Sequence, residues 1–349
     1  MRKANAGLLK MLLLKKIYFF CSNFILVVCS SSSLLLAQGN LSLPADGLNK
    51  VNKQLFIFHN STDVAKSIFL KHLTNELGGN VDAYPISSLD ITNMPLSDLS
   101  PLTESSANNC IITVGSDALK KAVATRNKIP IFSTLVSKHS LDRIIQNYQR
   151  FGSKIGGIYY EQSFNRQLLL AKAIDPEIES ALIFLNRQTR YQLGDYKNVA
   201  LNNAIKLKFY LLTPQASPQG YFAKNTTKKA ALILINEPVH HDVQDLQSLL
   251  ITSYNKQVPM IGNKKTDSIH AAMVSIYTPL NTLAKEVSRK ITDFCQTNKS
   301  RIASFSEDYQ IEINQQIADY LNYKNIDKQK LLADILRLEK QQQEMLNNG

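Results

Sequence analysis

Short apolar runs alternate with amphipathic stretches along most of the chain. The runs at residues 55–58, 110–114 and 181–185 are almost wholly apolar, as in strands buried on both faces of a sheet. Between such runs, apolar positions recur at helical spacing; residues 62–77 show it and end at Gly78 and Gly79. This alternation predicts repeated strand–helix–strand units and parallel sheets.

The units are too numerous for one comfortable sheet. We therefore expect an α/β fold of two doubly wound parallel-sheet lobes around a cleft, joined near residues 150–162. Residues 87–109 are rich in Ser, Asn, Asp and Pro and predict a loop. Residues 327–349 are charged and Gln-rich with an apolar stripe, which predicts a C-terminal helix. We favour a solvated helix packed on one lobe; a partner-binding helix is the alternative.

Ligands of doubly wound folds bind where the strands end at their carboxyl edge. Amide groups at a helix start, such as those of Gly115 and Ser116, are suited to hold a ligand carboxylate. Two alternatives stay open, since Ser116 and the His59–Asn60 pair are also suited to capping the helices that follow. The residues expected at strand ends are His59, Asn60, Gly115, Ser116, Leu135, Val136, Asn186, Asn236 and Asn263.

The first 37 residues have the pattern of a secretory signal peptide. Basic residues without any acid precede an apolar run at 17–29, which four serines and then Ala37 follow. We expect cleavage after Ala37 and an exported protein in the periplasm or cell envelope of a bacterium. An uncleaved anchor and a lipoprotein attached through Cys29 are the alternatives, since residues 26–29 resemble a lipoprotein box.

The formal net charge of +12 does not indicate nucleic-acid binding. Five of the 40 basic residues lie in the leader, and the others are scattered among 28 acidic residues. No basic run is interleaved with aromatic residues, as is typical of surfaces that follow a phosphate backbone. We expect a solvated lysine-rich surface and no nucleic-acid partner.

Two cysteines, Cys110 and Cys295, lie beyond the leader. In an oxidising compartment they are able to form a disulfide, but two buried free thiols are the arrangement that we favour. No C-x-x-C pair occurs, so the sequence predicts neither a zinc ribbon nor a thioredoxin-type redox site.

Motifs of the common catalytic chemistries are missing from the sequence. It contains no G-x-G-x-x-G, Walker A, H-E-x-x-H or G-x-S-x-G pattern. His240, His241 and Asp242 form the densest group of potential metal ligands, but adjacent histidines rarely both reach one ion. We expect a polar loop there, and a protein without enzymatic activity, cofactor or metal.

Several motifs in a fixed order resemble one protein family. They make residues 54–323 similar to the ABC-transporter substrate-binding-protein family with the type I periplasmic-binding fold, in the branch that includes binders of aromatic amino acids. The segments that carry the resemblance are GSDAL at 115–119, IPI at 129–131, IYYEQ at 158–162, RQLL at 166–169, the helix at 245–254, KQVPMIG at 256–262, and YQIEIN at 309–314 with Ala318.

The resemblance implies two lobes hinged by three crossing segments. It places the first lobe at 54–158 plus 273–323 and the second at 159–272, between the leader at 1–37 and a helical tail at 324–349. It adds Gln162, at the first crossing, to the expected ligand-binding residues. Many family members have an acidic residue near the position of Asn236, where it meets a ligand amine; here Asn236 is neutral.

The resemblance also implies the function. It predicts a solute-binding protein that closes two lobes on a small polar molecule, amino-acid-like or other, and serves an ABC importer with a permease and an ATPase. The alternative is an envelope scaffold or sensor on the same fold that has lost transport, with an envelope protein bound through the C-terminal tail.

Overall fold

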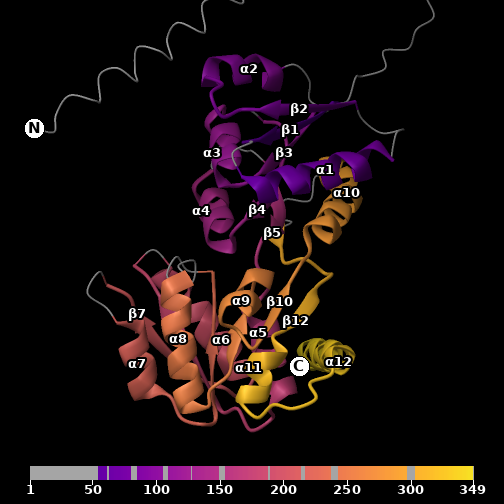
Figure 1. The fold of residues 1–349 in the computed structure, drawn as a ribbon. Coiled ribbons are helices and arrows are strands. Elements are labelled where there is room, and N and C mark those ends of the chain that lie inside the picture. Colours follow the sequence, from indigo (N-terminus) through magenta and orange to yellow (C-terminus); the bar gives the residue numbers. More distant parts are fainter. Residues whose placement is uncertain are drawn as a thin grey trace, which may run out of the picture. The chain divides into compact units, whose positions relative to one another are not determined.

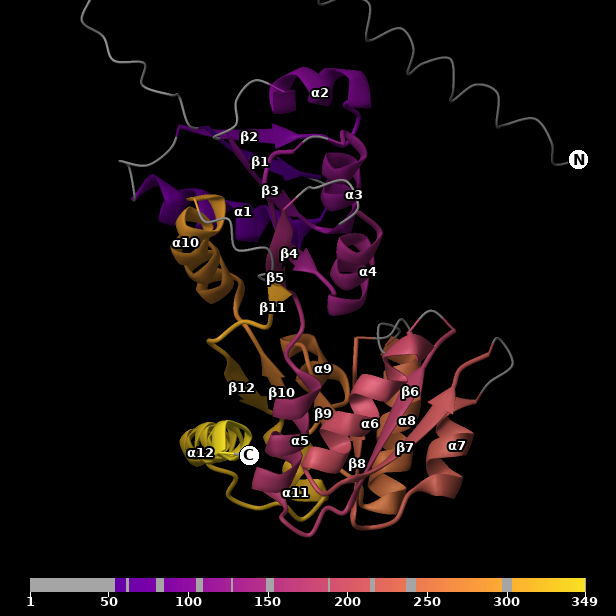
Figure 2. The same cartoon turned by 180° about the vertical axis from the view of Figure 1, so that it is seen from behind.

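Two six-stranded sheets alternate with helices along the chain (Figures 1 and 2). The computed structural model describes residues 54–60, 63–79, 85–104, 109–126, 128–148, 154–187, 189–213, 217–236, 243–296 and 303–348, all in the unit Val51–Gly349. The predicted signal peptide, its cleavage site and Cys29 lie outside these residues. No helix within the described ranges is both long and apolar enough to cross a membrane.

The first sheet is parallel throughout. Side chains of its first strand alternate between the two faces, so that Phe56 and Phe58 enter one core and Leu55 and Ile57 the other. Its strands are β1 (Leu55–His59), β2 (Ile86–Asp90), β3 (Cys110–Val114), β4 (Ile131–Val136), β5 (Ile155–Tyr159) and β11 (Ala303–Ser304), in the order β11-β5-β4-β3-β1-β2.

Helices cover both faces of this sheet. On one face pack α1 (Val64–Gly78) and α10 (Leu280–Gln296), and on the other α2 (Leu96–Glu104), α3 (Ser116–Ala124) and α4 (Lys138–Tyr148). Strands β4 and β5 approach closely at Gly157, where φ is +152° and a Cβ would lie 1.9 Å from the carbonyl oxygen of Ser133. Only glycine permits this pairing without movement of the backbone.

The second sheet is parallel except at one edge. Strand β12 pairs with β10 in the antiparallel direction, and the other pairs of neighbouring strands in the described part of this sheet are parallel. The strands are β6 (Ser180–Leu185), β7 (Lys206–Leu211), β8 (Ala230–Ile233), β9 (Met260–Gly262), β10 (Val274–Tyr277) and β12 (Gln310–Ile313), in the order β12-β10-β9-β8-β6-β7.

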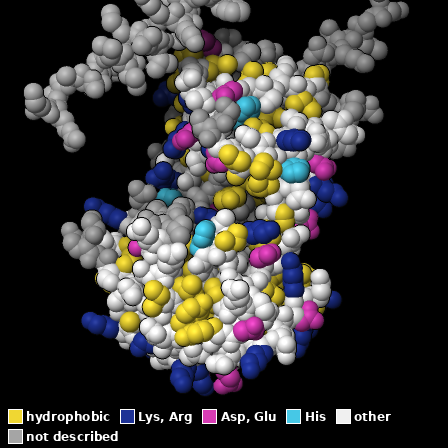
Figure 3. Space-filling view, in the orientation of Figure 1, with side chains coloured by type: hydrophobic (Ala, Val, Ile, Leu, Met, Phe, Trp, Pro, Cys, Tyr) yellow, Lys and Arg dark blue, Asp and Glu magenta, His cyan; other side chains and the backbone are white. Residues whose placement is uncertain are grey.

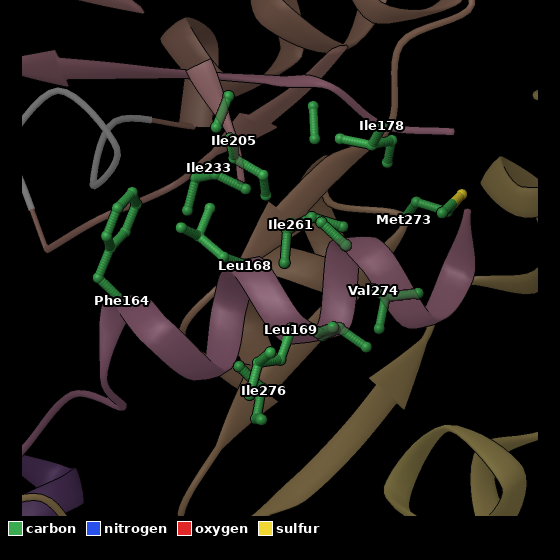
Figure 4. Packing of buried hydrophobic residues seen from close by; sticks show 14 of the residues in the cluster. Phe164, Leu168, Leu169, Ile178, Ile205, Ile233, Ile261, Met273, Val274 and Ile276 are labelled. Atoms are coloured by element: carbon green, nitrogen blue, oxygen red, sulfur yellow. The ribbon is translucent and has the colours of Figure 1, made fainter. Parts of the chain in front are cut away.

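Two apolar cores hold helices against this second sheet. Figure 4 shows one of them, in which Leu168 of an overlying helix lies beside Ile233 and Ile261 of the sheet. Helices α5 (Phe164–Ile174), α6 (Leu193–Asn202), α11 (Gln315–Tyr320) and α12 (Lys328–Asn348) belong to that core. Helices α7 (Pro218–Asn225) and α8 (Val243–Lys256) pack on the other face, and α9 (Lys265–His270) follows β9.

The chain returns to the first sheet later than expected. We assigned residues 273–323 to the first lobe, but β10 and β12 hydrogen-bond within the second sheet and α11 packs on it. Only α10 and β11 of that range join the first sheet. The expected loop at 87–109 was also wrong in part, because it contains most of β2 and all of α2.

The C-terminal helix α12 packs on α5 through apolar and charged contacts. Leu331 and Ile335 are buried in the core of the second sheet. Arg166 Nε donates to Glu339 Oε1 at 2.7 Å, and Asn165 Nδ2 donates to Gln342 Oε1 at 2.8 Å. The tail is therefore a helix packed on one lobe, as the sequence predicts.

Cys110 and Cys295 form a disulfide, so our expectation of two free thiols was wrong. Cys110 begins β3, and Cys295 lies near the end of α10 with its Cα 5.9 Å from that of Cys110. The reason is the packing of α10 on the first sheet, which brings together two residues separated by 185 positions. Spacing alone does not reveal such a pair.

Candidate functional site

Strand ends of the first sheet bring six predicted ligand-binding residues to one edge. Strands β1, β3 and β4 are neighbours, so the residues at their carboxyl ends and directly after them lie side by side. Gly115 there is the N-cap residue of α3 and donates its amide to Thr134 O at 2.9 Å. Val136 belongs to the apolar core on the α3 and α4 side. The six residues are His59, Asn60, Gly115, Ser116, Leu135 and Val136.

Two of these predicted residues each carry a polar side-chain atom without a hydrogen-bond partner among the described residues. These atoms are His59 Nδ1 and Asn60 Oδ1, and both are buried. Burial lowers the pKa of His59, and the nearby carboxylate of Asp90 opposes this shift. The neutral imidazole and the amide oxygen are therefore available to a hydrogen-bonding ligand.

Strand ends of the second sheet bring three further predicted residues to one edge. Strands β6, β8 and β9 are neighbours, and Asn186, Asn236 and Asn263 follow them. Asn186 is engaged locally, since its Oδ1 accepts from Thr189 N at 3.0 Å. Asn236 and Asn263 instead line a cavity at the carboxyl ends of β8 and β9.

This cavity has a volume of about 180 Å³. Its walls combine aromatic rings with amide and carboxyl groups. Among the rings, Phe164 and Tyr196 meet edge to face at 4.9 Å. The cavity is lined by Lys138, Glu161, Gln162, Ser163, Phe164, Asn165, Gln167, Gln192, Asp195, Tyr196, Val199, Ile235, Asn236, Asn263 and Phe305.

Local caps fix the helix that forms one wall. Ser163 is the N-cap of α5, and its Oγ accepts from Arg166 N at 3.2 Å. The helix therefore starts at Phe164, which places this ring and Gln167 at the cavity. Gln167 Nε2 donates to Leu234 O at 3.0 Å, which ties α5 to the end of β8.

Glu161 is the most perturbed charged group of the cavity. Its Oε1 accepts from the backbone amide of Lys138 at 2.8 Å, whereas its Oε2 is buried without a hydrogen-bond partner in the described part of the chain. Burial raises the pKa of this carboxyl to about 7. The backbone amides of Lys138 and of Glu161 itself, and the charges of Lys264 and Lys138, oppose this shift. A buried carboxyl in this state favours a hydrogen-bonding or cationic partner.

Polar side chains join the three crossing segments beside this cavity. The segments run between β5 and α5, between β10 and α10, and between β11 and β12. Gln162 Nε2 donates to Thr278 Oγ1, which donates to Asp308 O at 3.0 Å. Arg166 donates from one nitrogen to Gln162 Oε1 at 2.7 Å and to Ser306 O. Gln162 thus has a positioning role in addition to lining the cavity.

A second cavity of about 560 Å³ includes Tyr160, Asn263 and Lys264 in its lining. Burial lowers the pKa of Lys264, although the carboxylates of Asp267 and Glu161 oppose this. Asp267 Oδ2 accepts from the backbone amides of Asn263 and Lys264 at 2.9 and 3.0 Å, so this carboxyl fixes the start of α9.

No group of metal-ligating side chains occurs among the residues that the structure describes. His240, His241 and Asp242 lie outside the described residues. On the face drawn in Figure 3, Lys and Arg side chains lie apart from one another, and acidic side chains stand between some of them.

Solved structures share this arrangement of sheets and helices. A ligand-free, open substrate-binding protein with adhesive properties from Clostridium difficile aligns with a TM-score of 0.59 at 14% identity, over 80% of this chain and 97% of its own. An ABC domain in complex with L-Trp from Streptococcus pneumonia aligns with a TM-score of 0.50 at 11% identity, over 80% and 98%. The chain has the type I periplasmic-binding fold.

A third protein of this fold, a conserved domain protein from Vibrio cholerae, aligns with a TM-score of 0.52 at 13% identity, over 80% of this chain and 98% of its own. At such identities the likeness concerns the fold. A scan against protein-family models finds no match, and neither does a search of curated proteins. Within the type I periplasmic-binding fold, the described cavity lies at the strand ends where ligands of doubly wound sheets bind.

Sequence reasoning found part of the cavity and missed its charged groups. Gln162, Asn236 and Asn263 were predicted and line it, whereas Glu161 and Asp195 were not predicted. A signal for Glu161 was present, because it is an acidic residue two positions after the apolar strand at 155–159. Asp195 gave no signal, since it lies in an ordinary amphipathic helix. The other seven predicted residues do not line this cavity.

Proposed function

We propose that this protein is an exported solute-binding protein that captures a small polar molecule for an ABC importer and catalyses no reaction. The observation that carries the proposal is the cavity at the ends of β8 and β9, where Glu161, Asn236 and Asn263 meet aromatic walls. A few polar groups in a mostly apolar, concave site are typical of small-molecule binding. The shared fold of ligand-binding proteins, one of them in complex with L-Trp, supports this function.

We place ligand contacts first at Gln162, Asn236 and Asn263. The first-sheet edge supplies further proposed contacts through His59 and Asn60, whose buried polar atoms have no partner among the described residues. Closure of the lobes on the ligand would bring both edges to it. Gly115, Ser116, Leu135, Val136 and Asn186 complete the proposed set of ligand-binding residues.

The first test is a thermal-shift screen of the purified protein against amino acids, amines, peptides, nucleosides, sugars and purine-like compounds. We expect a saturable rise of the melting temperature with one chemical class, because a ligand of the native state stabilises it. Asn236→Ala should remove that rise, and Asn202→Ala, an exposed asparagine at the end of α6, should retain it. A folded protein that responds to no compound contradicts solute capture.

An envelope scaffold or sensor on the same fold is the second proposal. It is favoured by α12, which adds to the fold an exposed apolar side chain at Leu336 and another at Met345. Under this proposal, cross-linking in cells would trap an envelope protein on α12 and no ABC permease. Cross-links to a permease and an ATPase would support the transport role instead.

A further inference from the structure

The cavity at Glu161 holds two acidic groups, one of which is incompletely hydrogen-bonded among the described residues. One carboxyl oxygen of Glu161 accepts a backbone amide, and the other is buried and unpartnered in the part of the chain that is described. Asp195 adds a second carboxylate to the lining. A buried, unpaired carboxylate oxygen is costly, and a cationic hydrogen-bond donor removes that cost.

The positive charge of the lining is already engaged. Lys138 is the single lysine among the described lining residues, which include no arginine. Its Nζ lies 2.5 Å from Asp142 Oδ2 and 3.8 Å from Asp195 Oδ2. The charge of Lys264 also acts on Glu161, but this lysine lines the second cavity. A carboxylate on the ligand would thus meet two acids and a lysine that is already paired, which disfavours an acid or an α-amino acid at this position.

The remaining walls suit an apolar or aromatic body. Phe164, Tyr196 and Phe305 contribute rings, and Val199 and Ile235 contribute aliphatic surface. Aromatic faces also attract cations. A volume of about 180 Å³ is many times the ~10–15 Å³ that holds one water molecule, so the cavity admits a small organic ligand.

We propose that the cavity binds a small amine, with its protonated nitrogen at the carboxylate of Glu161 and its apolar body against the rings of Phe164, Tyr196 and Phe305. This inference rests on the proposed solute-binding function and narrows its ligand class. It places the acidic partner of the ligand nitrogen on the first crossing segment, which runs between β5 and α5.

Binding of such an amine is coupled to loss of a proton from the site. Burial holds the pKa of Glu161 at about 7 in the empty protein, so an arriving ammonium group must displace a proton from part of the population. The charged and titratable groups that interact with this carboxyl or line its cavity are Lys138 from α4, Asp195 from α6, Lys264 before α9, and Tyr160 and Tyr191. Affinity for an amine of pKa near 10 therefore rises between pH 6 and pH 8.

The test is calorimetric titration of the purified protein with compounds matched in their apolar body. We would use phenethylamine, phenylalanine, 3-phenylpropionate and 2-phenylethanol, together with aliphatic amines of four to eight carbons. The expected result is binding of one or more amines and at least tenfold weaker binding of the matched acid, amino acid and alcohol. Glu161→Gln should weaken amine binding at least tenfold at pH 8 and remove its rise with pH.

Two control variants separate loss of the charge from loss of the fold. Glu161→Asp keeps the carboxylate and should retain part of the amine affinity, and Asp117→Asn removes an exposed acid that pairs with Lys120 and should retain all of it. Preferred binding of the acid or amino acid, equal binding by Glu161→Gln, or no binding of any amine overturns the inference. If another class in the wider screen binds and Asn236→Ala removes that binding, the solute-binding function stands and only the amine assignment fails.

Discussion

At the scale of single residues, Glu161 has a buried carboxyl oxygen without a hydrogen-bond partner among the described residues. Acidic side chains are rarely buried without a partner, because transfer of the charge out of water is costly. Here one backbone amide offsets part of that cost, and the second oxygen has no partner in the described residues. Such an unsatisfied group is expected at a binding site, where local stability is given up for function.

Glu161→Gln should stabilise the empty protein, and more so at higher pH. The carboxyl ionises near pH 4.5 in the unfolded chain and near pH 7 in the folded protein, so the folded state holds the extra proton between these values. Stability therefore falls as pH rises from about 4.5 to 7, and the full penalty remains above pH 7. At ~1.4 kcal/mol per pKa unit the penalty is about 3 kcal/mol.

The measurement is the melting temperature of both proteins at pH 5 and pH 8 without ligand. We expect nearly equal values at pH 5 and a higher value for the glutamine variant at pH 8. An exposed acid serves as the control, so Asp117→Asn should show no such dependence on pH. A glutamine variant that is less stable at both pH values would show that the carboxyl is required by the fold.

At the scale of helices and strands, apolar pattern predicted the buried elements well and the polar ones poorly. Strands β3, β6 and β8 are buried along their whole length, and each is an almost wholly apolar run. Residues 87–90 of β2 were predicted as a loop because β2 lies at the sheet edge, where its residues alternate between exposed and half-buried and form no apolar run. The apolar pattern of a helix likewise does not reveal which cavity its polar residues line. Asp195 is an example, since it lies in the amphipathic helix α6 and lines the cavity.

Neither the apolar pattern nor the spacing of strands in the sequence shows which sheet a strand near the C-terminus joins. Residues 274–277 and 310–313 read as ordinary strands, and both pair in the second sheet instead of the first. The physical reason is non-local: α10 and β11 leave for the first sheet between them, and β12 then returns antiparallel to β10. Hydrogen bonding between strands that are distant in sequence determines this choice.

Helix α12 should contribute stability through its buried face. Ile335 is fully buried against the second sheet, whereas its neighbour Leu336 is 56% exposed. Ile335→Ala should lower the free energy of unfolding by about 2–5 kcal/mol through loss of buried surface and formation of a cavity. Leu336→Ala is the matched control and should change it by less than ~0.5 kcal/mol.

Chemical denaturation of the two variants beside the wild type provides the comparison. Arg166 and Asn165 hydrogen-bond to α12, and Arg166 also hydrogen-bonds to the crossing segments. Unpacking of α12 should therefore also disturb the hydrogen bonds of the crossing segments. Equal, small effects of both substitutions would mean that α12 does not stay packed on α5 in solution.

At the scale of the whole described chain, long-range contacts join segments that the sequence separates widely. The three crossing segments are held by hydrogen bonds of Gln162, Thr278 and Arg166. The first sheet is held to α10 by the disulfide between Cys110 and Cys295. Neither network follows from local sequence, because each depends on the order in which the strands pair.

Reduction of the disulfide should destabilise the protein. The bond closes a loop with a sequence separation of 185 residues, and removal of a native disulfide typically costs about 2–5 kcal/mol. We expect a lower denaturation midpoint for the wild type in the presence of reductant. The double variant Cys110→Ser/Cys295→Ser should show the lower midpoint with and without reductant. A wild-type midpoint that does not respond to reductant would contradict a stabilising role for this bond.

The position of this bond also determines how the molecule responds to proteolysis. Every strand of the second sheet except β12 lies between Cys110 and Cys295 in the sequence, within the covalently closed loop. A single cut of the backbone anywhere between these two cysteines leaves both fragments joined by sulfur. Such a nicked protein migrates as one chain on a non-reducing gel and separates into two only after a thiol is added, whereas a cut in α12 releases its fragment under either condition.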